Sequence, residues 1–238
     1  MMPEKLYGRE PEINALLAAF DRIARGEAPI LALVSGKSGI GKSAVVNEFY
    51  RTLVPRRGLL SGGKFDQYMH DIPYSTFKQA LQATIRALLG KSEAELNEWR
   101  SALQEALEPN GRLVVDLVPE LGLILGDQPP VVELPPTDSQ RRFQLVLGRF
   151  LAVFARPEHP FVLFLDDLQW LDIATLELIE YLLVQSDLRF LMLIGAYRDD
   201  EVDSEHPLTS KIGAIRRAGG LVEEIRLGPL GNEQVAEL

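Results

Sequence analysis

The sequence predicts an α/β fold in which a mainly parallel five-stranded sheet lies between two layers of helices, with a helical insertion in the middle of the chain. Two observations support this prediction. Five short apolar runs alternate with segments of helical periodicity, and about 95 residues separate the second run from the third. Such an alternation is typical of a doubly wound sheet, which binds its ligand at the carboxyl ends of the strands.

The N-terminal third predicts two helices and two strands. Residues 9–25 place apolar side chains on one helical face, and residues 30–35 are short and apolar enough for a buried parallel strand. Residues 44–50 continue as a helix, and a weaker, glycine-rich strand follows at residues 58–65. These segments supply the first two strands of the sheet.

The long connection that follows predicts a helical insertion at about residues 73–125, because a minimal crossover between parallel strands needs only one helix. Residues 73–89 have the apolar spacing of one helix. Ser92 and Glu95 form a capping-box pattern, which predicts the start of another.

A proline-rich linker is expected at about residues 127–137, which contain four prolines. We expect an amphipathic helix to begin after it, near Asp138 or Ser139. The expected buried face of this helix consists of Phe143, Leu145, Val146, Phe150 and Val153.

Three further apolar runs complete the predicted sheet, at residues 161–165, 190–197 and 221–227. Asp172 can cap a helix between the first two of these strands. A short helix at about residues 208–217 precedes the last strand.

The strongest chemical signal is a G-x-x-x-x-G-K-S segment between the first predicted strand and the following helix. Its glycines allow the backbone to curl so that N–H groups and the helix N-terminus face a polyphosphate. Lys42 would bridge the β- and γ-phosphates of ATP, and Ser43 would offer its hydroxyl to Mg²⁺. A glycine-rich turn without a ligand is the alternative, which the regular flanks disfavour. The expected nucleotide-binding residues are Gly36, Lys37, Ser38, Gly39, Ile40, Gly41, Lys42 and Ser43.

A second acidic element follows the apolar run at residues 161–165, where Asp166 and Asp167 stand at the expected end of a strand. Asp166 would hold Mg²⁺, directly or through water, and Asp167 would orient or deprotonate the attacking water. An acidic helix cap after a core strand is the competing interpretation. Because the acidic pair occurs together with the phosphate loop, we favour the metal-binding and catalytic roles.

Composition limits the classes of partner. The chain of 238 residues has a net charge of −9 and no cysteine, so nucleic acid is an unlikely partner and zinc–thiolate sites are excluded. The start of the chain lacks the apolar region of a secretory signal, and no stretch approaches membrane-spanning length. We therefore expect a cytoplasmic protein without membrane insertion.

Several segments together resemble a known family. They are residues 6–10, the phosphate loop, residues 63–67, Pro73-Tyr74, residues 166–172 and residues 195–199. The combination resembles the AAA-type ATPase module of large bacterial multisensor kinases, both serine/threonine and histidine kinases. That module is related to the origin-recognition-like ATPases and the STAND signalling class. The resemblance extends from residue 6 to about residue 230 and implies an AAA-type P-loop NTPase fold.

The resemblance also implies roles for residues outside the two motifs. It places Leu6, Tyr7 and Gly8 near the adenine, with an ordinary turn as the alternative. Arg198, after the fourth predicted strand, matches the sensor position beside the γ-phosphate. A surface salt bridge to Asp199, Asp200 or Glu201 competes with that role, and Trp170 is expected to be a packing residue.

The family's C-terminal helical and winged-helix region is expected to be absent, because the chain ends at Leu238. We expect residues 1–238 to form one P-loop NTPase domain that binds MgATP and hydrolyses it slowly to ADP as a conformational switch. Its partners would be other domains or subunits of a signalling kinase assembly. The alternative function is a nucleotide-retaining scaffold that uses residues 73–125 as an interaction surface. A DNA motor and a small-molecule kinase are disfavoured.

Overall fold

A five-stranded sheet forms the centre of the computed structural model, which describes residues 8–53, 59–64 and 73–229. The strand order is β2-β3-β4-β1-β5, and every neighbouring pair is parallel. This arrangement confirms the predicted α/β fold. The strands are β1 (Ile30–Ser35), β2 (Leu59–Lys64), β3 (Phe161–Asp166), β4 (Leu191–Tyr197) and β5 (Leu221–Arg226).

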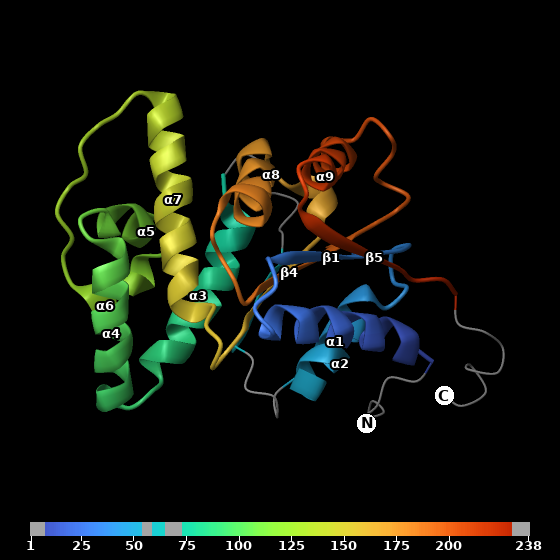
Figure 1. The fold of residues 1–238 in the computed structure, drawn as a ribbon, viewed down its shortest axis with the longest axis horizontal. Coiled ribbons are helices and arrows are strands. Elements are labelled where there is room, and N and C mark those ends of the chain that lie inside the picture. Colours follow the sequence, from blue (N-terminus) through green and yellow to red (C-terminus); the bar gives the residue numbers. More distant parts are fainter. Residues whose placement is uncertain (1–7, 54–58, 65–72, 230–238) are drawn as a thin grey trace.

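Helices cover both faces of the sheet (Figure 1), because successive side chains of a strand point to opposite faces. Ile30, Ala32 and Val34 of β1 pack with the first two helices, whereas Leu31 and Leu33 belong to the core on the other face. On the first face lie α1 (Glu10–Ala24) and α2 (Lys42–Leu53); α3 (Ser75–Leu89), α8 (Ile173–Glu180) and α9 (Pro207–Arg217) contribute to the second core.

Further helices stand beside the sheet, on the left of Figure 1. They are α4 (Glu93–Leu107), α5 (Gly111–Leu117), a 3₁₀ turn (Pro119–Leu121), α6 (Gly122–Leu125) and α7 (Pro136–Phe154). The predicted capping box opens α4: the Ser92 hydroxyl accepts from the Glu95 N–H at 3.4 Å, and the Glu95 carboxylate accepts from the Ser92 N–H at 3.3 Å. None of the helices in the described ranges is long and apolar enough to cross a bilayer.

Two expectations for α7 were wrong. The helix begins at Pro136 rather than near Asp138 or Ser139, because a proline in the first turn has a suitable φ and needs no hydrogen-bond acceptor. Leu145, expected on the buried face, is 45% exposed. At roughly 100° per residue it lies well around the helix from Phe150, which is fully buried. Leu147, Leu151 and Phe154 complete the buried face instead.

Candidate functional site

The strand order brings the two sequence motifs together. Strand β4 lies between β3 and β1, so the residues that follow these three strands meet at one edge of the sheet. A cavity of about 280 Å³ opens there. It is lined by Ser38, Gly39, Gly41, Lys42, Ser43, Ala44, Asp166, Asp167 and Arg198.

The phosphate loop has a backbone that only glycine adopts readily. Gly39 and Gly41 have φ angles of +74° and +103°, in the region that disfavours side chains. A Cβ atom added to either glycine would meet no atom within 4 Å. The backbone angles therefore explain the two glycines, and the open space beside them can accommodate a phosphate.

Lys42 is the first residue of α2 and is 8% exposed. Its Nζ donates to the carbonyl oxygens of Gly36 at 2.8 Å and Lys37 at 3.1 Å. These acceptors are neutral, so they do not balance the buried positive charge. A phosphate in the cavity would supply the opposite charge and further hydrogen-bond acceptors.

Ser43 and Asp166 come from different elements but form one oxygen pair. The Ser43 hydroxyl donates to Asp166 Oδ2 at 3.0 Å, and Asp166 is 7% exposed at the end of β3. Mg²⁺ prefers hard oxygen ligands and usually retains some waters, so this pair suits the ion. The residues present therefore fit the Mg²⁺ that the motifs imply.

Asp167 has a backbone conformation that is unusual for a residue with a side chain, with φ +56° and ψ +48°. Its N–H donates to Asp166 Oδ1 at 3.0 Å. Its own Oδ1 accepts from Gln169 Nε2 at 3.1 Å and lies 3.8 Å from Arg198 Nε. Aspartate tolerates this left-handed region better than most side chains, and such residues cluster at functional sites, where the surrounding contacts hold them.

Arg198 reaches the cavity and also forms the competing salt bridge. Its Nη1 donates to Glu201 at 2.6 Å, and this hydrogen bond is the main reason that the pKa of Arg198 is raised. Trp170 has a more specific contact than general packing, since the Arg198 guanidinium carbon lies 5.1 Å from the centre of its ring. The guanidinium is thus held between a carboxylate and an aromatic face at the edge of the site.

Two residues near the site had no predicted role. Gln169 is 6% exposed, and its Oε1 accepts a hydrogen bond from the backbone N–H of Arg198 at 3.3 Å. Arg9 is 5% exposed, and its Nη2 donates to the Ile40 carbonyl at 3.3 Å and the Gly228 carbonyl at 2.8 Å. Both residues belong to segments that carry the family resemblance, and this was the one signal in the sequence that could have marked them as site residues. Sequence spacing alone does not reveal their partners.

The resemblance places Leu6, Tyr7 and Gly8 near the adenine. Leu6 and Tyr7 lie outside the described residues. Gly8 is described and has a φ of +72°. The next residue, Arg9, donates to the Ile40 carbonyl in the phosphate loop, so the chain enters the fold close to the site. Contact between this segment and the base stays a prediction.

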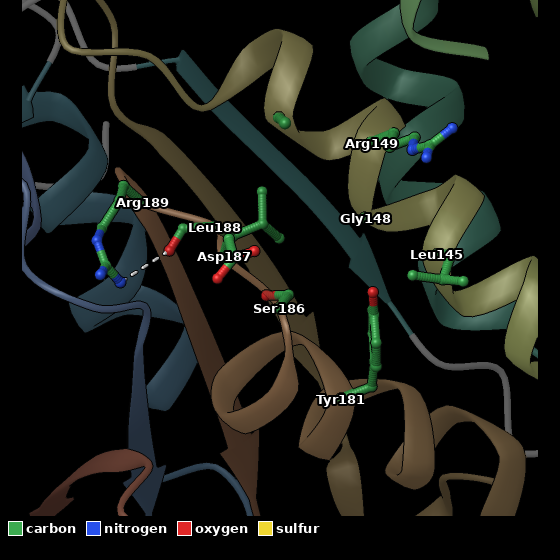
Figure 2. Close-up of a pocket in the computed structure, with 9 residues that line it drawn as sticks. Leu145, Gly148, Arg149, Tyr181, Ser186, Asp187, Leu188 and Arg189 are labelled. Atoms are coloured by element: carbon green, nitrogen blue, oxygen red, sulfur yellow. Dashed lines mark hydrogen bonds between the residues drawn. The ribbon is translucent and has the colours of Figure 1, made fainter. Parts of the chain in front are cut away.

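A second cavity, of about 360 Å³, lies between α7 and the segment that joins α8 to β4 (Figure 2). Tyr181 begins a π-helical turn there and its hydroxyl points toward Gly148. Arg149 and Arg189 also line it. Because the joining segment precedes β4, this cavity lies toward the amino ends of the strands, away from the phosphate loop.

Comparison with known proteins identifies a family and a relative. The family model described as "AAA ATPase domain" matches residues 5–194. "Hybrid signal transduction histidine kinase G" from Dictyostelium discoideum is 35% identical over 179 residues, which are 75% of this chain and 5% of the kinase. The chain therefore spans a small part of that relative. The expected bacterial origin stays a prediction.

Solved structures share the fold. Cdc6p from Pyrobaculum aerophilum matches with a TM-score of 0.55 and 14% identity, over all of this chain and 49% of that one. The Aeropyrum pernix Orc1 protein, solved in complex with DNA, matches with a TM-score of 0.50 and 18% identity, over 99% of this chain and 49% of that one. This chain spans about half the length of each. We expected nucleic acid to be excluded as a partner, and the Orc1–DNA structure does not support that expectation.

Proposed function

Because the chain belongs to the AAA ATPase domain family, we propose that it is the ATP-binding regulatory module of a signal-transduction protein. In this proposal it binds MgATP and hydrolyses it slowly to ADP, and the two nucleotides favour different conformations. The observation that carries the proposal is one cavity that contains the buried Lys42, the Ser43–Asp166 oxygen pair and Asp167.

The binding half of the proposal rests on the phosphate loop. Its N–H groups and Lys42 would hold the β- and γ-phosphates, while Ser43 and Asp166 would hold Mg²⁺. When bound, Mg²⁺ would neutralise part of the charge on these phosphates. The open side of Gly39 and Gly41 supports this placement, because an added Cβ would project into free space.

The hydrolytic half rests on Asp167 and Arg198. Asp167 would orient a water whose oxygen attacks the γ-phosphorus, and the bond from that phosphorus to the ADP oxygen would break. The proton released by the water would pass to the Asp167 carboxylate. Arg198 would turn from Glu201 toward the γ-phosphate and stabilise its charge, a role that its 3.8 Å approach to Asp167 supports.

The first test is a titration with a fluorescent ATP analogue in the presence of Mg²⁺. Lys42→Ala is expected to weaken binding about 100-fold or more, because it removes a charge-assisted contact from a buried site. Lys91→Ala, at an exposed lysine just before the α4 capping box, is the matched control and is expected to bind normally. Unchanged binding by Lys42→Ala would contradict the proposal.

The second test separates hydrolysis from binding. Asp167→Asn is expected to bind MgATP with native affinity and to hydrolyse it at least about 100-fold more slowly, because an amide cannot accept the proton. Hydrolysis is followed as phosphate release under single-turnover conditions. Native turnover by Asp167→Asn would exclude Asp167 as the catalytic group.

A scaffold that retains nucleotide without useful hydrolysis is the second candidate. Large apolar side chains exposed in and after the helical region favour it, with Leu123 71% exposed and Val132 75% exposed. In this proposal residues 73–125 form an insertion in a single P-loop domain. Residues 127–135, the part of the expected linker that precedes α7, link it to that helix, and other domains or subunits of a kinase assembly bind it. Binding of such a partner by Asp167→Asn, together with no turnover by the native chain, would favour the scaffold.

A further inference from the structure

A single buried amide connects the Asp167 carboxylate to the backbone of Arg198, the two residues that are proposed to act on the γ-phosphate. We propose that Gln169 is a positioning residue, which holds the Asp167 carboxylate toward the cavity and prevents it from closing onto Arg198. The inference rests on the proposed function, because the position of Asp167 matters only if that carboxylate acts on water. It assigns a role to a residue that the motifs leave unexplained.

The contacts of Gln169 define one orientation of its amide. Nε2 donates to Asp167 Oδ1 at 3.1 Å, and Oε1 accepts from the backbone N–H of Arg198 at 3.3 Å. A flipped amide would place its oxygen against a carboxylate and its NH₂ group against an N–H donor. Both contacts would be lost at a site that is 6% exposed, so the amide has one favourable position.

Gln169 lies in a 3₁₀ turn, Leu168–Trp170. Besides the hydrogen bond to the Arg198 backbone, packing also holds this turn against β4. Leu168 is 1% exposed and packs against Gly195, where an added Cβ would lie only 2.2 Å from Leu168 Cδ1. The Trp170 ring lies against the Arg198 guanidinium. The turn and the end of β4 therefore form one packed unit, and the amide joins them through its bond to the backbone N–H of Arg198.

The distances around Arg198 indicate what the amide prevents. Arg198 contacts Glu201 at 2.6 Å but stays 3.8 Å from Asp167, although both acids can attract it. The Asp167 oxygen nearest to Arg198 is the one that accepts from Gln169, so the amide competes with the guanidinium for that atom. Without the amide, Asp167 and Arg198 are free to form a close ion pair that occupies both groups. With it, Asp167 keeps its position when Arg198 turns toward the γ-phosphate.

A double-mutant cycle tests the inference through hydrolysis. Gln169→Met removes both hydrogen bonds at similar volume, and Gln169→Glu keeps the acceptor for the Arg198 N–H but loses the donor to Asp167. Each is expected to lower the single-turnover rate about 10-fold or more, with MgATP affinity within about threefold of native. In an Asp167→Asn background, Gln169→Met is expected to cause no further loss, because its effect passes through Asp167. Gln185→Met, at an exposed glutamine, is the matched control.

A second measurement does not depend on activity. The NMR resonance of the Arg198 Nε–H group, assigned with Arg198→Lys, reports the partner of the guanidinium in the nucleotide-free protein. In Gln169→Met this resonance is expected to shift and to exchange more slowly with water, as the side chain closes onto Asp167. Far-UV circular dichroism establishes that each variant is folded.

The inference is overturned if Gln169→Met hydrolyses ATP at the native rate, or if it slows native and Asp167→Asn protein by the same factor. An unchanged Arg198 resonance in the folded variant would also overturn it. These outcomes differ from failure of the proposed function, which is native ATP binding by Lys42→Ala or native hydrolysis by Asp167→Asn. Native hydrolysis by Asp167→Asn would also overturn the inference, because Gln169 would then have no catalytic group to position.

Discussion

Asp166 and Asp167 are neighbouring carboxylates with different surroundings. Asp166 accepts from the Ser43 hydroxyl and from the Asp167 N–H, so its oxygens face the phosphate loop and the turn. Asp167 faces an amide and a guanidinium instead. Environment sets which of two adjacent acids suits a metal and which suits a water. The sequence supplied the pair, and the folded contacts separate their proposed roles.

Glu95 gives a prediction for pH at the residue scale. The hydrogen bond from the Ser92 hydroxyl, helped by Lys91 and the Ser92 N–H, lowers the pKa of Glu95 from 4.5 to about 2. A lowered pKa in the folded protein means that the charged form stabilises the fold above about pH 4.5, and that this contribution is lost as the pH falls toward 2. We therefore expect native protein to melt at a slightly higher temperature than Glu95→Gln near neutral pH.

This difference in melting temperature is expected to shrink as the pH is lowered from 5 toward 3, measured by circular dichroism. Glu98→Gln, on the same helix, is the matched control. Added salt is expected to reduce the effect, because Glu95 is exposed and part of it comes from Lys91. A difference that stays constant across this pH range would contradict the assignment.

At the scale of elements, β4 controls the site although it carries neither motif. Its position between β3 and β1 places Arg198 beside Asp167, and its Gly195 allows Leu168 to pack closely against the strand. The 3₁₀ turn from Leu168 to Trp170 begins with the residue that makes this close approach. Two contacts therefore join the turn to the end of β4: Leu168 packs against Gly195, and the Gln169 amide accepts from the backbone N–H of Arg198.

Gly195→Ala is expected to lower the free energy of unfolding by about 1–3 kcal/mol, because the new methyl group overlaps the buried Leu168 side chain. Urea unfolding measures this change. Gly213→Ala is the matched control: Gly213 lies inside α9, and its added Cβ would meet only Arg217 Nη1, at 3.4 Å. Alanine is expected to be neutral or stabilising there, since it favours helices. Equal effects at the two positions would exclude close packing at Gly195 as the cause.

Most helix and strand bounds could be predicted to within one or two residues, because they depend on local patterns. Asp172 caps α8 as expected, with its carboxylate accepting from the Thr175 N–H at 2.8 Å. The errors concern α2, which ends at Leu53 rather than at residue 50, and α7, where a proline extended the first turn and Leu145 faces solvent. Periodicity identifies an apolar stripe, but neighbouring elements decide which part of it is covered.

For the whole molecule, the net charge of −9 predicts weak binding to nucleic acid. We expect no measurable binding of a 20-base-pair DNA duplex at physiological salt, followed by fluorescence anisotropy at low and high salt. Tight, salt-sensitive binding would contradict this prediction. Loss of such binding in Arg149→Glu would locate it at the cavity of Figure 2, which contains Arg149 and Arg189.

The sequence by itself determined the α/β class, the phosphate loop and the acidic pair at a strand end. These features are encoded by residues that are close along the chain, so spacing and periodicity reveal them. Only the tertiary structure decided the strand order, and with it the approach of Arg198 to Asp167. The contacts of Gln169 and Arg9 join residues 29 and 219 positions apart. Such contacts depend on which strands become neighbours, and that choice is made by packing of the whole core rather than by any local segment.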